Sequence, residues 1–89
     1  MKAVELVSWN LKRLRVRLDM SQEKLALDAD VDRSYVGRLE RGQENPTVEV
    51  LERLATALGA KVLDLFRAPR KGERPPTSLP GGRRKASRR

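Results

Sequence analysis

Residues 21–42, SQEKLALDADVDRSYVGRLERG, constrain the fold of this chain more than any other stretch. Ser21 and Asp32 each precede a short helical pattern, and their side chains can accept hydrogen bonds from the free N–H groups at a helix start. Only residues 29–31 separate the two patterns, and Asp30 tolerates left-handed backbone angles better than most residues. A corner of that length sets two helices steeply across each other. The sequence therefore predicts two short helices joined by a tight turn.

The apolar and the basic residues of this segment fall on different helix faces. Apolar contacts are expected from Leu25, Ala26, Val31, Val36 and Leu39. On the second helix, polar and basic positions recur at spacings of three and four residues, so they share the opposite face. These positions are Arg33, Ser34, Gly37, Arg38 and Arg41. Such a face is typical of a helix-turn-helix that inserts its second helix into DNA.

Apolar residues outside this segment predict three further helices and no strand. Residues 4–18 carry one helical stripe, formed by Val7, Leu11, Leu14 and Leu18. Thr47 can cap a fourth helix that Gly59 ends. The inner face of that helix is expected to hold Leu51, Leu54, Ala55 and Leu58. With a short fifth helix over residues 60–66, the chain is expected to form an all-α, five-helix bundle.

Composition excludes several classes of function. The sequence contains no cysteine and no histidine, so thiolate or imidazole metal sites and histidine acid–base catalysis are excluded. We therefore expect that the protein is not an enzyme and has no catalytic residue, no cofactor and no metal. No stretch approaches the roughly 20 apolar residues of a membrane span, which favours a cytoplasmic protein without a membrane partner.

The net charge of +8 is concentrated at the C-terminus. Residues 1–67 hold 12 Lys and Arg against 11 Asp and Glu, whereas residues 68–89 hold eight against Glu73 alone. Residues 68–89 are rich in proline, glycine and charged residues. This segment therefore cannot bury enough apolar surface to offset the entropy of ordering. We expect a domain over 1–67 and a disordered basic tail over 68–89. The tail can follow phosphates or enter a narrow minor groove, or it serves solubility or an acidic protein partner.

Residues 7–66 resemble the Cro/C1-type (XRE) helix-turn-helix domain of phage repressors and bacterial regulators. The resemblance is carried by Asn10, Leu11, Arg15, Ser21, Gln22, Leu25, Ala26, residues 33–36, residues 39–42, residues 45–47, Leu54, residues 57–59, Leu65 and Phe66. It implies a lambda-repressor-like five-helix bundle that is usually a homodimer on an inverted-repeat operator. It also implies an architectural ion pair between Arg15 and Glu40.

The chain departs from the pattern of that family at several helix ends. Asp19 and Asp30 stand where the family commonly has glycine, and Asp32 stands where it has a Ser or Thr cap. Aspartate can serve all three roles. Lys61 replaces the usual cap of the fifth helix, and Leu63 is apolar where polar residues are common, which indicates an adjusted dimer surface.

Roles in DNA binding can be assigned residue by residue. Arg33 and Arg38 can each contact guanine through two hydrogen bonds, which gives about 1–3 kcal/mol of base discrimination. The other base-reading candidates are Ser34, Tyr35 and Gly37. Gln22 lies where free N–H groups and the helix dipole favour a phosphate. The other phosphate candidates are Arg13, Arg17, Arg41, Gln43 and Asn45, and the expected dimer interface holds Leu58, Leu63 and Phe66.

Two classes of function remain. The first is a sequence-specific regulator of transcription, expected to be a homodimeric repressor on double-stranded DNA, with a restriction-modification controller protein as one variant. The second is a protein-interaction module, chiefly an antitoxin that binds a toxin protein and represses its own operon. An adjacent pair of restriction-modification genes would favour the controller, and an adjacent small toxin gene would favour the antitoxin.

Overall fold

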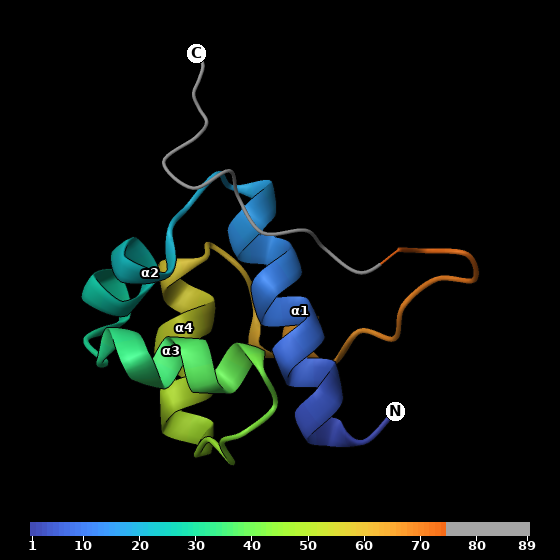
Figure 1. The fold of residues 1–89 in the computed structure, drawn as a ribbon, viewed down its shortest axis with the longest axis horizontal. Helices are drawn as coiled ribbons and strands as arrows, with labels where there is room; N and C mark the ends of the chain where they lie inside the picture. Colours follow the sequence, from blue (N-terminus) through green and yellow to red (C-terminus); the bar gives the residue numbers. More distant parts are fainter. Residues whose placement is uncertain (75–89) are drawn as a thin grey trace.

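The computed structural model describes residues 1–74. Within them the chain forms α1 (Ala3–Arg17), α2 (Gln22–Ala29), α3 (Arg33–Glu40), α4 (Val48–Ala57) and the 3-10 segment η1 (Val62–Phe66), with no strand (Figure 1). The all-helical prediction is confirmed for this part of the chain. Residues 75–89, most of the predicted basic tail, lie outside the described residues.

The expected fifth helix is a 3-10 segment of five residues rather than an α-helix. Its start is tightened locally: the backbone N–H of Lys61 donates to Asp64 Oδ2 at 2.8 Å, and the N–H of Asp64 donates to the Lys61 carbonyl at 2.9 Å. Pro69 disfavours helical geometry at the residue before it, so the segment cannot extend far. A segment of five residues forms i→i+3 backbone hydrogen bonds more readily than a series of i→i+4 hydrogen bonds.

The predicted inward faces form one aliphatic core. Leu11, Leu25, Val36, Leu54 and Leu65 are fully buried at 0% exposure, and the remaining buried apolar side chains are Val7, Ala26, Ala29, Leu39, Leu51, Ala55 and Leu58. The prediction that Leu18 belongs to the buried apolar face of α1 is wrong, because its side chain is 51% exposed. The helix ends at Arg17, and the chain turns away at once.

Each of the four α-helices is followed within two residues by a residue with positive φ, which reverses the chain sharply. Two of these residues are glycines, Gly42 (φ 72°) and Gly59 (φ 65°), and two are Asp19 (φ 57°) and Asp30 (φ 58°). The expectation that aspartate takes the place of glycine is therefore confirmed. At the corner between α2 and α3, the N–H of Val31 donates to the Ala26 carbonyl at 2.9 Å and closes the turn.

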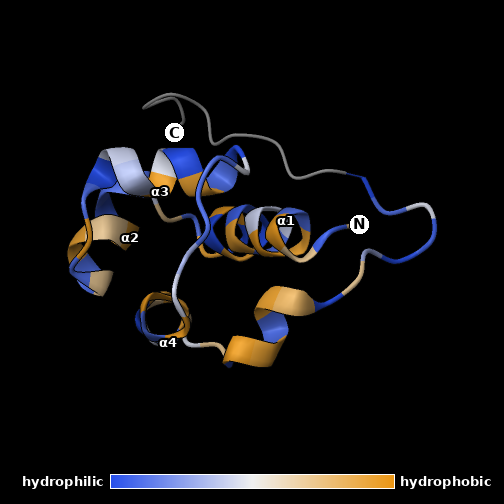
Figure 2. Ribbon diagram, turned by 90° about the horizontal axis from the view of Figure 1, so that it is seen from below, coloured by the Kyte–Doolittle hydropathy of each residue, from blue (hydrophilic) through white to orange (hydrophobic). Residues whose placement is uncertain are grey.

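The helices place the outer face of α3 far from η1. α1 contacts α3 on one flank and η1 on the other, and α4 packs against α2 and η1. Figure 2 shows α3 on one side of α1 and the 62–66 segment on the opposite side. No helix within residues 1–74 is both long and apolar enough to cross a membrane.

Candidate nucleic-acid interface

The start of α3 is fixed by Asp32. Its carboxylate accepts a hydrogen bond from the Ser34 backbone N–H at 3.1 Å, and the Ser34 hydroxyl also donates to it. These two bonds, the hydroxyl first, lower the pKa of Asp32 below its usual value. The carboxylate is therefore charged at neutral pH, next to the exposed Arg33 side chain. Because Ser34 is bound to the cap, its hydroxyl is already engaged in the free protein.

Tyr35 and Arg38 lie together on α3, where Tyr35 is partly buried against the core and Arg38 is partly exposed. The Arg38 guanidinium carbon is 5.8 Å from the Tyr35 ring centroid, and Arg38 Nε donates to Glu44 Oε2 at 2.6 Å. Burial, followed by the nearby Glu44 charge, raises the pKa of the Tyr35 phenol. The phenol therefore keeps its proton at neutral pH and can donate a hydrogen bond to a base or a phosphate.

Gly37 lies beneath this surface rather than on it. The residue is buried, and a Cβ added to it would lie 3.3 Å from Arg41 Nη1 and 3.8 Å from Gln22 Oε1. The missing side chain thus leaves room for two neighbouring side chains of the motif. This packing accounts for the glycine without DNA, and a close approach of DNA at Gly37 stays a prediction.

A buried ion pair joins α1 to the end of α3. Arg15 Nε and Nη2 donate to the two oxygens of Glu40 at 2.6 and 2.9 Å, and the side chains are only 5% and 4% exposed. Arg15 Nη1 also donates to the Met20 carbonyl at 2.8 Å. Gln22 Nε2 donates to Glu40 Oε1 at 3.0 Å. The amide group that was predicted to bind phosphate is therefore tied to the ion pair, and its phosphate role stays a prediction.

Three other phosphate candidates follow α3 directly. Arg41, Gln43 and Asn45 are exposed, and Arg41 Nε donates to Gln43 Oε1 at 3.0 Å. Their backbone continues the last turn of α3, since the N–H of Gln43 donates to the Arg38 carbonyl at 2.9 Å. They therefore lie beside the candidate base-reading residues.

Arg13 and Arg17 lie on a different side of the molecule. Each is two positions from Arg15, and two positions correspond to about 200° around an α-helix. Because Arg15 faces α3, the other two arginines point away from it. Both line a hollow beside the turn formed by residues 67–73. Burial, followed by the nearby charge of Arg67, lowers the pKa of Arg13. The structure does not bring these two phosphate candidates together with α3.

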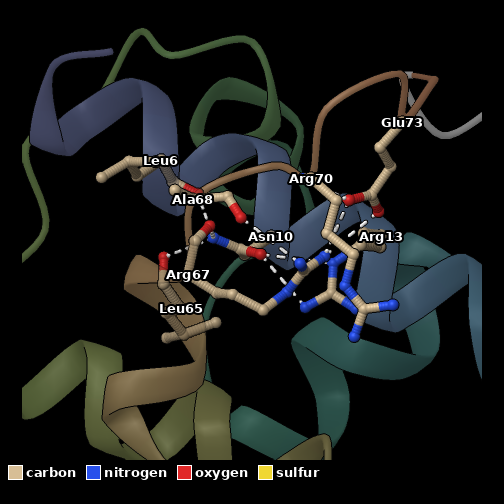
Figure 3. A network of polar contacts seen from close by, with 8 residues as sticks. All are labelled: Leu6, Asn10, Arg13, Leu65, Arg67, Ala68, Arg70 and Glu73. Carbon is tan, nitrogen blue, oxygen red and sulfur yellow. Dashed lines mark hydrogen bonds and ion pairs between the residues drawn. The ribbon is translucent and has the colours of Figure 1, made fainter.

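Asn10 forms a polar network that sequence reasoning did not identify (Figure 3). Its side chain is fully buried, and Nδ2 donates to the carbonyl oxygens of Leu6, Leu65 and Arg67 at 2.9, 3.0 and 2.8 Å. Arg13 in turn donates to Asn10 Oδ1 from Nε and Nη2 at 3.2 and 3.1 Å. The network fastens the end of η1 to α1.

The described part of the basic tail, residues 68–74, forms a turn fastened by Glu73. Arg67 Nη2 lies 3.1 Å from Glu73 Oε2, and the N–H of Arg70 donates to Glu73 Oε1 at 2.9 Å. The bond from Arg70, followed by those from Arg67, lowers the pKa of Glu73. Composition alone did not predict this turn, although Gly72 next to the only acid of the tail was its available signal.

A further contact that the sequence did not predict supports the corner between α2 and α3. Arg53 on α4 donates from Nε to the Ala29 carbonyl at 3.1 Å and from Nη2 to the Asp30 carbonyl at 3.2 Å. These carbonyls belong to the last residue and the C-cap of α2, and carbonyls at a helix end lack intrahelical donors. The guanidinium therefore holds the corner that sets the angle of α3.

The three predicted dimer residues differ in accessibility. Leu63 is 80% exposed, whereas Leu58 is 5% exposed and belongs to the core of its own chain. Phe66 is partly buried against that core. Leu63 is therefore the member of the set that a second subunit can contact most fully.

Comparison with known proteins agrees with this geometry. The helix-turn-helix family model matches residues 11–65. Control protein C.BamHI from Bacillus amyloliquefaciens is 36% identical over 62 residues, which cover 68% of this chain and 76% of that protein. The crystal structure of the restriction-modification controller protein C.AhdI from Aeromonas hydrophila is 41% identical, covers 71% of this chain and 96% of its own, and superposes with a TM-score of 0.69.

A further solved structure contains DNA. It is the restriction-modification controller protein C.Esp1396I, a tetramer in complex with its natural 35 base-pair operator. It is 30% identical to this chain, covers 74% of this chain and 87% of its own, and has a TM-score of 0.68. The family model spans well over half of the present sequence and includes α2, α3 and the corner between them. The chain therefore belongs to the helix-turn-helix family.

Proposed function

We propose that this protein is a sequence-specific DNA-binding regulator of transcription that acts as a homodimeric repressor on an inverted-repeat operator. The observation that carries the proposal is the exposed basic face of α3, which the buried Arg15–Glu40 pair holds in a fixed orientation. Operator binding by a relative at 30% identity supports it. As a DNA-binding regulator without an enzymatic role, the protein would act in the cytoplasm.

The proposed division of roles follows the geometry of the interface. Arg33 and Arg38 contact guanine bases in the major groove, and Tyr35 contributes a further base or phosphate contact. Phosphate contacts come from Gln22 at the start of α2 and from Arg41, Gln43 and Asn45 after α3. Phosphate contacts set the orientation of α3, and base contacts select the site. Two copies of α3 related by a twofold axis would read half-sites about 34 Å apart.

Selection of bound duplexes from a random DNA library tests this function. An enriched inverted repeat with half-sites about one helical turn apart would support a dimeric, sequence-specific regulator. A library that emerges without enrichment from several rounds at physiological salt would contradict it. Placing the enriched site over a promoter and measuring transcription would then give the sign of regulation.

Leu63 provides a test of the proposed dimer. Replacing Leu63 with aspartate is expected to raise the dimer dissociation constant by at least about tenfold, because the variant no longer buries a leucine and instead buries a charge. Sedimentation equilibrium measures the constant. The matched control is Leu27→Asp on α2, where the leucine is 76% exposed and lies outside the proposed interface. Equal dissociation constants for the two variants would rule out Leu63 as an interface anchor.

The basic tail is proposed to add affinity without sequence information. A chain that ends after Arg74 keeps the Glu73 turn and lacks Arg83, Arg84, Lys85, Arg88 and Arg89. It is expected to keep its site preference but to bind more weakly and with a smaller salt dependence. The slope of log affinity against log salt should fall by about 0.9 for each phosphate that the shortened chain no longer neutralises. A binding titration that gives the same slope for both chains would favour a role in solubility or protein binding.

Among regulators, we propose a restriction-modification controller protein as the specific role. The restriction-modification controller protein C.AhdI is 41% identical to this chain over 96% of its own length, and control protein C.BamHI is 36% identical over 76% of its own. An adjacent pair of endonuclease and methyltransferase genes in the genome would support this role. An adjacent small toxin gene would favour the antitoxin alternative, whose toxin partner stays a prediction from sequence.

A further inference from the structure

Glu44 lies against the proposed DNA-reading surface although its charge opposes binding to phosphates. It belongs to the loop after α3, and its carboxylate accepts the hydrogen bond from Arg38 at 2.6 Å. The side chains of Arg38 and Glu44 are 42% and 28% exposed, and an ion pair so exposed contributes little to folding stability. Neither phosphate binding nor stability accounts for a carboxylate at this place.

Two contacts fix the orientation of the Arg38 guanidinium. Glu44 holds its Nε, and one face of the group lies over the Tyr35 ring. Within residues 1–74, no hydrogen bond or ion pair engages the two terminal nitrogens of Arg38. A guanidinium bound at Nε keeps the edge formed by Nη1 and Nη2, which can donate two parallel hydrogen bonds to guanine O6 and N7.

The loop that carries Glu44 is itself held in place. Gly42 has left-handed backbone angles, with φ 72°, and the N–H of Gln43 donates to the Arg38 carbonyl at 2.9 Å. The chain therefore turns back beside Arg38 instead of leaving the end of α3. Because the carboxylate is placed by this turn, Arg38 is oriented before DNA arrives and gives up less rotamer entropy when it binds a base.

We propose that Glu44 is a specificity-determining residue that positions Arg38 for guanine and lowers the affinity for DNA in general. This inference rests on the function proposed above. Its signature is a pair of opposite effects. Removing the carboxylate strengthens binding to any DNA, because one negative charge is removed, and it weakens discrimination at the base pair that Arg38 reads.

The test uses the full chain and the site that it selects from random DNA. Binding is measured to that site, to its single base-pair variants and to unrelated DNA at one salt concentration. For Glu44→Ala we expect stronger binding to unrelated DNA and roughly tenfold weaker discrimination at one base pair. Glu44→Gln keeps an acceptor for Nε without the charge, so its discrimination should fall between those of the wild type and Glu44→Ala. In an Arg38→Ala background, Glu44→Ala should cause no further decrease in discrimination.

Glu23→Gln is the matched control for the change in charge. Glu23 is exposed in the first turn of α2, and no side-chain hydrogen bond engages it within the described residues. This control should strengthen binding to all DNA equally and leave discrimination unchanged. Discrimination by Glu44→Ala that equals or exceeds that of the wild type would overturn the role of Glu44 and leave the proposed function intact. Failure of the wild type to select any site would instead contradict the proposed function.

Discussion

Replacing Glu40 with alanine is expected to destabilise the domain by about 3–5 kcal/mol, because the Arg15 guanidinium then stays buried without its counter-charge. The pair is almost completely excluded from water, and each partner makes a further hydrogen bond, to Met20 and from Gln22. Small domains have only about 5–15 kcal/mol of total stability. A large fraction of the variant molecules should therefore be unfolded at moderate temperature. Urea unfolding followed by circular dichroism measures the decrease in stability.

Two controls separate burial from charge in this experiment. Asp28→Ala breaks the exposed Lys24–Asp28 pair, whose side chains are 58% and 31% exposed, and should cost less than about 0.5 kcal/mol. Replacing both buried partners, Arg15→Met with Glu40→Leu, should recover most of the stability, since apolar side chains avoid the desolvation cost. If Glu40→Ala were no more destabilising than Asp28→Ala, the architectural role of the pair would be wrong.

Replacing both Arg33 and Arg38 with alanine is expected to remove most of the preference for the selected site. Each guanine contact contributes about 1–3 kcal/mol of discrimination, so the ratio of specific to non-specific affinity should fall by roughly 30-fold or more. The fold should be retained, because Arg33 is exposed and the Arg38–Glu44 pair is partly exposed. Fluorescence anisotropy with labelled site and unrelated duplexes measures both affinities.

The double variant Arg17→Ala and Arg70→Ala is the control for this change in charge. It also removes two cations, but both lie in the hollow beside the 67–73 turn, away from α3. It should weaken binding to the two duplexes to a similar degree and leave their ratio near the wild-type value. A ratio that falls equally in both double variants would show that charge, rather than the position of the arginines, determines the preference.

Local sequence signals predicted the helices and most of the core. Ser21, Asp32 and Thr47 cap α2, α3 and α4 through their side chains, as their residue types indicate. The left-handed turns at Asp19 and Asp30 were predictable because aspartate tolerates the conformation for which glycine is usually required. These features depend on residues that are close together in the chain, so they can be predicted from the local sequence.

Features that depend on distant partners were not predictable from local pattern. Arg53 binds carbonyls that lie 24 and 23 residues earlier, and Asn10 binds carbonyls that lie 55 and 57 residues later. An apolar pattern also does not tell a residue of the core from one of a dimer interface. Leu58 and Leu63 were therefore assigned to the same interface, although only Leu63 is exposed.

The candidate site could likewise be predicted from the sequence only in part. The sequence identified the basic residues of α3, but the pairing of Arg38 with Glu44 depends on how the loop after Gly42 turns back. Likewise, Arg13 and Arg17 were grouped with the phosphate candidates by charge alone, and the rotation of α1 separates them from α3. Residue type predicted the chemistry of these side chains, and packing determined which of them share a surface.

Selection of the DNA site by the outer face of α3 is central to the proposed function. Selection from one random duplex library, carried out in parallel with the wild type and the variant lacking Arg33 and Arg38, tests it most directly. We predict an enriched inverted repeat for the wild type and no enrichment of that repeat for the variant. Recovery of the same repeat by both proteins would contradict the role of α3.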